Sequence, residues 1–227
     1  MITKDQKKML ITNGYTPLPQ IANKNISHEE IDNLILNKNK IYTSSTDFHK
    51  KYIEENCIHS KLKKDLNKIA GEYYKSNSNY DDTYEITRIT KGTQASEAYL
   101  GHFDSHLFTL VTPIVIPQTE SSESGQLVLF PKIRKEPKNE ISNIIGKIFY
   151  KRYQSKETFL NLMKSKNFAE FDFKDQTPIL FLGRVSLHAN RGFAENMKDH
   201  RITLLTHFFD PSPKYGVGNI LRMIRSR

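Results

Sequence analysis

From about residue 84 onward, the chain is divided into short apolar segments of strand length, separated by polar turns. Residues 84–90 alternate and are rich in β-branched side chains, 107–117 form an almost continuous apolar run, and 126–130 form a third segment. Segments at 178–187 and 201–209 are also apolar and of strand length. Short strands joined by polar turns are typical of an antiparallel sandwich or jelly roll rather than a parallel sheet. The sequence therefore predicts a jelly roll.

The first eighty residues differ, because their apolar side chains recur with helical spacing. A helix over 4–13 is predicted to end at Gly14, a residue that favours helix C-termini. Capping-box spacing at 27–30 indicates the start of a second helix, and Phe48 begins a third. The leucines that follow Ser60 predict a longer helix. We expect these helices to support the strands.

A further helical segment, residues 132–167, interrupts the predicted strands. It begins with a basic loop and continues with apolar residues at helical spacing: Ile144, Ile145, Ile148 and Phe149. We expect these side chains to pack down on the barrel and the segment to cover the active site, with buttressing of the sheet as the alternative. A single domain is predicted, with helical support over 1–80, jelly-roll strands over 84–130 and 168–211, and the insert over 132–167.

Composition restricts the class of protein. The single cysteine, Cys57, excludes an internal disulfide framework and a Cys-rich zinc site. The sequence has no apolar run of membrane-spanning length, and its first ten residues lack the apolar core of a secretory signal, so we expect a cytoplasmic protein. The net charge of +9 favours acidic partners, although the lysines are spread along the whole chain. Nucleic acid is a less favoured partner than a small molecule, and the sequence does not indicate an oligomeric state.

The tripeptide His102-Phe103-Asp104 carries the strongest chemical indication. It closes a second candidate strand at 97–104, in which residues two apart point to the same side. A distal histidine, His188, follows the segment 178–187, and Arg201 opens the last strand. Two histidines and one carboxylate can occupy one face of an octahedral iron(II) and leave three positions open.

The order of His-x-Asp, distal His and then Arg resembles the pattern of the iron(II)/2-oxoglutarate-dependent dioxygenase superfamily. The final strand, RITLLTHFF, resembles the family's Arg-x-Ser/Thr followed by aromatic residues. The resemblance covers 84–125 and 178–211 and extends weakly to the N-terminus. It implies an α+β fold, a double-stranded β-helix of the cupin-like jelly-roll type. It also implies a hydroxylase that uses iron(II), 2-oxoglutarate and O2 and releases succinate and CO2.

The resemblance also implies roles for individual residues. His102, Asp104 and His188 would bind the iron(II), and the presence of Asp104 favours hydroxylation, because halogenases of the superfamily carry Gly or Ala there. Arg201 would bind the far carboxylate of 2-oxoglutarate as a bidentate cation. Thr203, two residues further on, would add a hydroxyl donor on the same side of the strand.

Several residues compete for these roles or extend the site. Arg191 is a rival to Arg201 for the cosubstrate, although it falls in a loop, and His106 is a rival to His102 in an order unlike that of the family. Asn190 and Arg191 flank the distal ligand and are candidate substrate residues, as is Arg134, which could bind an acidic group. The remaining histidines are interpreted as surface or packing residues: His28, His49, His59, His200 and His207.

The function predicted from these residues is hydroxylation of a small, polar, amino-acid-like substrate. The argument for size is that the chain has no further domain with which to recognise a macromolecule. A peptidyl or protein hydroxylase and a nucleic-acid demethylase are alternatives within the same enzyme class. A jelly-roll binding module for an anionic ligand, metal-free or zinc-bearing and without catalytic activity, is the alternative from a different class.

Overall fold

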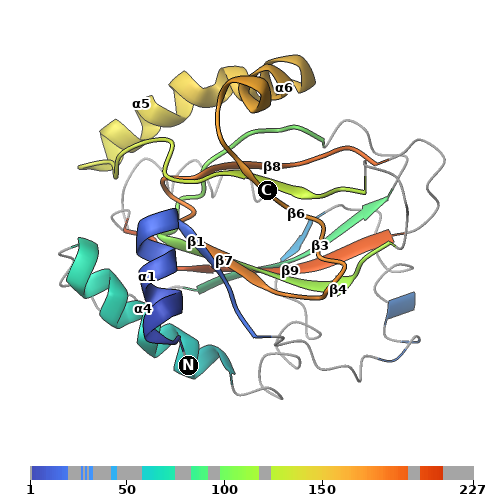
Figure 1. Cartoon of the computed structure of the whole chain (residues 1–227), viewed down its shortest axis with the longest axis horizontal. Coiled ribbons are helices and arrows are strands. Elements are labelled where there is room, and N and C mark those ends of the chain that lie inside the picture. The colour runs from blue at the N-terminus through green and yellow to red at the C-terminus, as the bar shows by residue number, and fades with distance from the viewer. Residues whose placement is uncertain are drawn as a thin grey trace.

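The structure, a computed structural model, describes residues 2–19, 27, 29, 31–32, 42–44, 58–74, 83–91, 98–117, 124–193 and 200–211. In this part of the chain, two antiparallel sheets face each other and helices lie outside them (Figure 1). The larger sheet has the strand order β1-β7-β4-β9-β3-β2, and the smaller has the order β6-β5-β8. The predicted α+β jelly-roll fold is confirmed.

The bounds of the elements follow the chain. The helical elements are α1 Lys4–Asn13, α4 Ile58–Tyr74, α5 Glu140–Tyr150, the 3-10 helix η2 Lys151–Tyr153 and α6 Lys156–Ser165. The strands are β1 Tyr15–Pro17, β2 Tyr42–Ser44, β3 Thr83–Lys91, β4 Phe108–Val115, β5 Leu127–Phe130, β6 Ala169–Phe171, β7 Ile179–Phe181, β8 Leu187–Asn190 and β9 His200–Phe208.

Helix α1 has defined caps at both ends. The Thr3 side chain accepts from the backbone N–H of Gln6, and the Gln6 side chain accepts from the backbone N–H of Thr3. Gly14 has a φ of 84° and donates its N–H to Leu10 O at 3.0 Å. This left-handed conformation costs glycine little, which explains why the predicted helix ends there.

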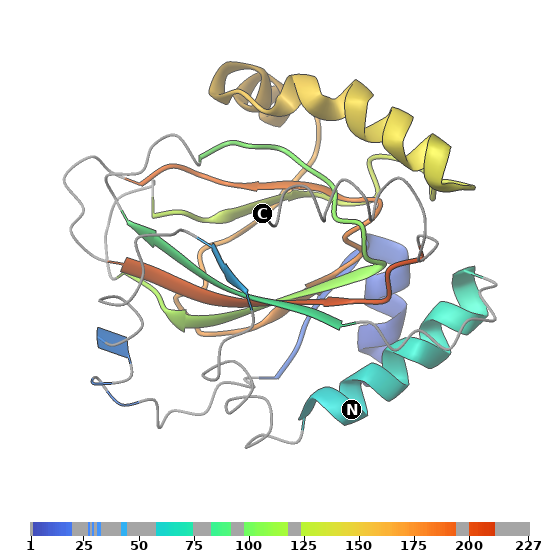
Figure 2. The same cartoon turned by 180° about the vertical axis from the view of Figure 1, so that it is seen from behind.

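Helices α1 and α4 pack against the outer face of the larger sheet, as the two opposite views show (Figures 1 and 2). Leucines of both helices share one buried cluster with residues of β4 and β7. The helix predicted from the leucines after Ser60 is therefore confirmed as α4, with Leu62 and Leu66 buried and Tyr73 half exposed. The predicted helix that begins at Phe48 lies outside the described residues, and so does most of the capping box at 27–30.

Helices α5 and α6 cover the outer face of the smaller sheet (Figure 1). Phe159 and Leu162 of α6 pack with Val128 and Phe130 of β5. A separate buried cluster between the two sheets joins Phe181 with other apolar residues: Val111, Ile116, Leu127, Leu129, Phe173 and Ile179. These contacts fix the two sheets relative to each other and so determine the space between them.

The prediction that the apolar residues of α5 pack on the barrel is wrong. Ile145, Ile148 and Phe149 are 60%, 66% and 58% exposed, and Ile144 is only partly buried. The buried side of the helix carries Asn143, whose Oδ1 accepts a 2.8 Å hydrogen bond from Arg134 Nη2. Polar contacts therefore fix the orientation of α5, and its most apolar face points outward.

Two predicted strands differ from the structure. Most of the candidate strand at 97–104 is turn and loop in the described part, residues 98–104, with only an isolated bridge at His102. The candidate strand at 178–187 is two strands, β7 and β8, which belong to different sheets and are separated by a turn over 183–185. Gly183 begins that turn, so the chain crosses from one sheet to the other just before His188.

Among the described residues, no helix is both long enough and apolar enough to cross a membrane.

Candidate active site

His102 and His188 are brought together by backbone pairing between the loop at 100–104 and strand β8. Each residue donates its N–H to the carbonyl oxygen of the other, at 3.0 Å in both directions. The centroids of the two imidazole rings lie 4.3 Å apart. The pairing places a half-exposed histidine of the loop beside a buried histidine of the smaller sheet.

The ring orientation of both histidines is set by backbone carbonyls. Nδ1 of His102 lies 2.8 Å from Leu100 O, and Nδ1 of His188 lies 3.2 Å from Ser186 O. A carbonyl only accepts, so each Nδ1 is the protonated nitrogen and each Nε2 keeps its lone pair. Proteins usually orient a metal-binding imidazole in this way, with its other ring N–H donating a hydrogen bond to an acceptor of the protein.

Asp104 completes the group. Its Oδ1 lies 4.0 Å from His102 Nε2, and its Oδ2 lies 3.6 Å from His188 Nε2. One ligand atom from each of the three residues lies within 4.8 Å of the others, a spacing that fits a single metal ion. The strand that was predicted to align His102 with Asp104 is absent. A backbone hydrogen bond from Asp104 N to Gly183 O, 3.1 Å long, places the carboxylate instead.

The electrostatics of the group favour metal binding. Burial alone would raise the pKa of Asp104, but the nearby imidazoles of His188 and His207 lower it well below the usual value. Burial lowers the pKa of His188 to about 4, against the opposing effect of Asp104. Asp104 is therefore an anion and His188 a neutral imidazole at physiological pH, the protonation states in which these side chains bind metal.

Thr109 and His207 support the carboxylate from the larger sheet. The hydroxyl of Thr109 donates to Asp104 Oδ2 and lies 3.1 Å from Nδ1 of His207, which is itself 3.6 Å from Asp104 Oδ2. Thr109 and His207 are register partners on β4 and β9. Of the two interpretations of His207 from the sequence, surface residue or packing residue, the structure excludes the first, because His207 is buried beside Asp104.

A cavity of about 120 Å³ between the sheets extends from this group. Its lining includes all three metal-ligand candidates together with Arg201 and Thr203 of β9. Arg201 is 2% exposed, and burial, with a smaller effect of Arg88, lowers its pKa to about 9. Its Nε has no hydrogen-bond partner among the described residues, and its guanidinium lies 5.3 Å from the Phe173 ring. A buried cation with an unpaired donor fits an anionic ligand in this cavity.

The rival arginine has a different environment. Arg191 forms an ion pair with Glu170 of β6, with Nε 2.6 Å from Oε1 and Nη2 2.9 Å from Oε2. It does not line the cavity, whereas Arg201 does. His106, the rival to His102, is buried near His207 and does not belong to the metal-binding group found among the described residues.

Of the three candidate substrate residues, only Asn190 lines the cavity, and Arg191 and Arg134 do not. With its amide oxygen turned toward β3, Asn190 accepts hydrogen bonds from the Arg88 guanidinium. Arg134 instead donates from Nε and Nη2 to Arg184 O, at 2.9 and 2.6 Å, and stacks over Phe103. These contacts occupy the Arg134 side chain beneath α5 and indicate a structural role. They do not support the predicted contact with substrate.

His207 and Arg88 line the cavity although they were not among the predicted site residues. Arg201, Thr203, Leu205 and His207 alternate along β9, and all line the cavity. Arg88 of β3 pairs with Thr203 across the sheet and lines it too. Side chains two residues apart share a face, so the placement of Arg201 in the site already implied that of His207.

Comparison with solved structures identifies the fold. A Pseudomonas putida prolyl-4-hydroxylase matches with a TM-score of 0.51 and 9% identity over 90% of this chain and 96% of its own. HygX from Streptomyces hygroscopicus, solved with nickel and 2-oxoglutarate bound, gives 0.51 and 10% over 95% and 88%. SnoN, a non-heme α-ketoglutarate-dependent epimerase from nogalamycin biosynthesis, gives 0.52 and 12% over 95% and 85%. No family model matches the sequence, and no curated protein matches it.

The chain shares its fold with these solved structures, and His102, Asp104 and His188 form a candidate metal-binding group between its two sheets. The donor set fits iron(II), since two neutral imidazoles and one carboxylate leave coordination positions open for a cosubstrate and dioxygen.

Proposed function

We propose that this protein is an iron(II)/2-oxoglutarate-dependent oxygenase that hydroxylates a small polar substrate and releases succinate and CO2. The observation that carries the proposal is the shared cavity. It is lined by the candidate triad His102, Asp104 and His188 and by the buried guanidinium of Arg201. 2-Oxoglutarate needs both: a metal for its keto-acid end and a cation for its far carboxylate.

Each residue of the candidate site has a defined role in this proposal. His102 and His188 present Nε2 to the metal, because backbone carbonyls hold their Nδ1 atoms. Asp104 supplies the anionic ligand and is oriented by Thr109. Arg201 binds the far carboxylate, and Thr203, buried two residues away on the same strand, is placed to donate a hydroxyl hydrogen bond. When bound, iron(II) supplies the activation of dioxygen.

The sheets that surround the cavity exclude water from the reaction. Phe181 and Val111, both buried, line the cavity and belong to the packed cluster between the sheets. Exclusion of water strengthens the interaction between Arg201 and a carboxylate and limits side reactions. The proposal of hydroxylation rests on the presence of Asp104.

The experiment is a turnover assay. Purified protein with iron(II), 2-oxoglutarate and dioxygen is screened against amino acids, peptides and nucleosides, and succinate is measured. The proposal predicts succinate release that requires iron(II) and rises with a substrate from the amino-acid group. If no mixture yields succinate although the protein is folded and binds iron, the binding-module alternative would replace the oxygenase.

A further inference from the structure

A second, larger cleft opens beside His102. It has a volume of about 530 Å³, within the range of small-molecule sites, and it lies between the α5–η2 segment and the ends of β3 and β8. It shares four lining residues with the metal-site cavity: Arg88, His102, Ala189 and Asn190. A molecule in this cleft would therefore reach the metal site from its open side, where His102 is half exposed.

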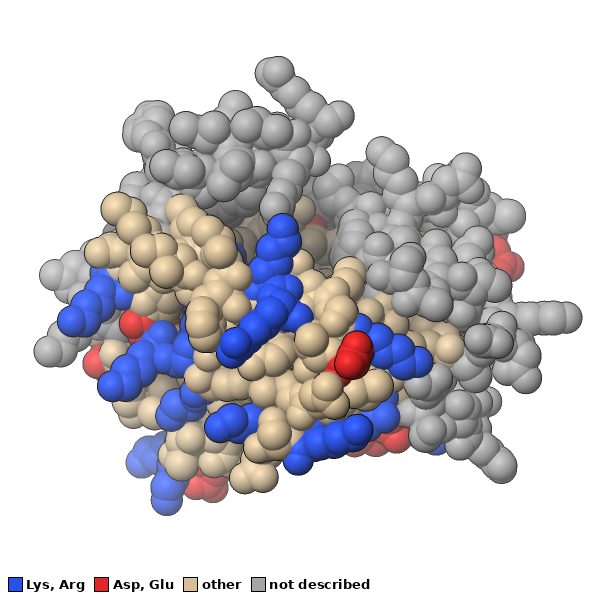
Figure 3. Space-filling view, turned by 90° about the horizontal axis from the view of Figure 1, so that it is seen from above, with Lys and Arg blue, Asp and Glu red and all other residues tan. Residues whose placement is uncertain are grey.

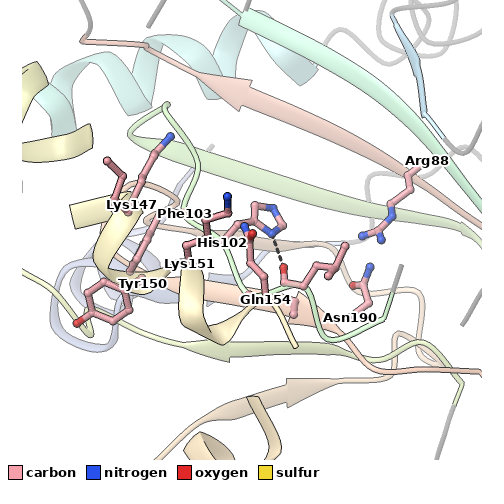
Figure 4. Close-up of a pocket in the computed structure, with 12 residues that line it drawn as sticks. Arg88, His102, Phe103, Lys147, Tyr150, Lys151, Gln154 and Asn190 are labelled. Carbon is pink, nitrogen blue, oxygen red and sulfur yellow. Dashed lines mark hydrogen bonds between the residues drawn. The ribbon is translucent and has the colours of Figure 1, made fainter. Parts of the chain in front are cut away.

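The walls of the cleft carry positive charge. Arg88, Lys147 and Lys151 line it, and none of the described lining residues is a carboxylate. Figure 4 shows Lys151 and Gln154 on one side of His102 and Arg88 and Asn190 on the other. On the side of the molecule that carries α5 and α6, Lys and Arg side chains spread over the described surface and Asp and Glu are sparse (Figure 3).

Lys151 is the cation best placed for a ligand. It is exposed on η2, and the described residues provide no ion pair for its ammonium group. Lys147 of α5 differs, because its Nζ donates to Ser105 Oγ at 3.0 Å and its side chain is half-buried. An uncompensated positive charge at the rim of a concave site attracts anions and repels cations.

The same cleft also has an apolar part. Ile148 of α5 lines it while remaining 66% exposed, and Phe103 and Tyr150 meet edge to face at 4.9 Å in the same wall. Contact between an exposed isoleucine at the mouth of a cleft and the apolar portion of a ligand removes apolar surface from water, which favours binding. The lining therefore combines an apolar wall with a cationic one.

We propose that the cleft is the substrate site and that the substrate is a small organic anion. Its carboxylate or phosphate group contacts Lys151 and Gln154, and its apolar portion lies against Ile148. The inference rests on the proposed function and refines it, because it requires an anionic group on the substrate. The anion site is distinct from Arg201, which lies in the inner cavity and outside this cleft.

The test is a binding measurement without turnover. Protein loaded with iron(II) and 2-oxoglutarate under anaerobic conditions is dialysed to equilibrium against matched probes: N-acetyl-L-phenylalanine and its amide, and phenyl phosphate and phenol. The visible absorption of the iron–2-oxoglutarate chelate is recorded in the same samples. Loss of that absorption would count against the proposed function, whereas the dialysis result concerns the anion preference alone.

The expected result is at least tenfold tighter binding of a charged probe than of its neutral partner. The two charged probes distinguish a carboxylate site from a phosphate site. Lys151→Glu removes the preference and leaves the chelate absorption unchanged. Lys164→Glu, the same change at an exposed position of α6 outside the cleft, keeps the preference. Equal binding of charged and neutral probes, no binding of either, or a preference that survives Lys151→Glu would overturn the proposal.

Discussion

Gly183 and Asp104 are held together so closely that no larger residue fits at position 183. The Asp104 N–H donates to Gly183 O at 3.1 Å, and a Cβ on Gly183 would lie 2.8 Å from Asp104 Oδ2 and 2.5 Å from Thr109 Oγ1. The turn that carries the chain from β7 to β8 therefore also positions the carboxylate. The missing side chain leaves room for Asp104 and its hydroxyl donor.

Gly183→Ala is expected to weaken iron(II) binding by tenfold or more, because the carboxylate and its Thr109 contact must shift, and supporting contacts of metal ligands typically contribute 10–100-fold. Iron affinity is measured by anaerobic titration. Gly71→Ala is the matched control, since a Cβ there meets no atom within 4 Å and the helix should gain about 0.5–1 kcal/mol in stability. Unchanged iron affinity in Gly183→Ala would show that Asp104 does not depend on this packing.

Arg201→Ala is expected to weaken 2-oxoglutarate binding by roughly thirtyfold or more, because loss of a buried charge partner costs about 2–5 kcal/mol and about 1.4 kcal/mol corresponds to tenfold. The dissociation constant of 2-oxoglutarate in the iron-loaded protein measures this. Arg191→Ala serves as the control, since Arg191 is paired with Glu170 away from the cavity. The reverse pattern, with only Arg191→Ala affected, would move the cosubstrate site to the loop.

Substitutions on the two faces of α5 should differ in their effect on the free energy of unfolding. Asn143→Ala removes the acceptor of the Arg134 Nη2 hydrogen bond in a buried position, so we expect a loss of about 1–3 kcal/mol in the free energy of unfolding. Ile145→Glu lies on the exposed face and should change stability by no more than about 0.5 kcal/mol. Urea denaturation measures both, and a large loss in Ile145→Glu would mean that this face is buried after all.

Metal-free protein should lose stability in mild acid. His188 has a pKa near 4 in the folded state and near 6.5 when unfolded, so the unfolded chain binds more protons between these values. The contribution of His188 is present above pH 6.5 and is lost as the pH falls toward 4, by up to about 3 kcal/mol. Denaturation of chelator-treated wild type and His188→Asn across this range checks it. A variant with the same acid sensitivity as wild type would assign the effect to other groups.

The local pattern of the chain predicted much of the fold, and contacts distant in sequence account for the errors. Helix α1, strand β9 and the jelly-roll class follow from spacing and caps that lie within a few residues of each other. The convergence of His102 and Asp104 was predicted from strand parity, although pairing with His188 and Gly183 produces it. No local pattern could show this, because both partners lie about eighty residues away.

Helix α5 shows the same limit in another form. Its periodicity correctly indicated a helix, and the most apolar face was assigned to the core. The hydrogen bonds of Arg134 with Asn143 and Arg184 O orient the helix the other way. A buried polar network that joins three separate segments outweighs the hydrophobic pattern of one of them, and it is invisible to a periodicity argument.

We propose that His102, Asp104 and His188 would bind one iron(II), which the protein requires to convert 2-oxoglutarate to succinate. Asp104→Ala tests it most directly, with iron content and succinate release measured in the same preparation and Asp172→Ala, at an exposed position, as the control. The account predicts that the Asp104 variant remains folded, loses iron binding and releases no succinate, whereas the control retains both. Full iron binding and full succinate release in Asp104→Ala would contradict it.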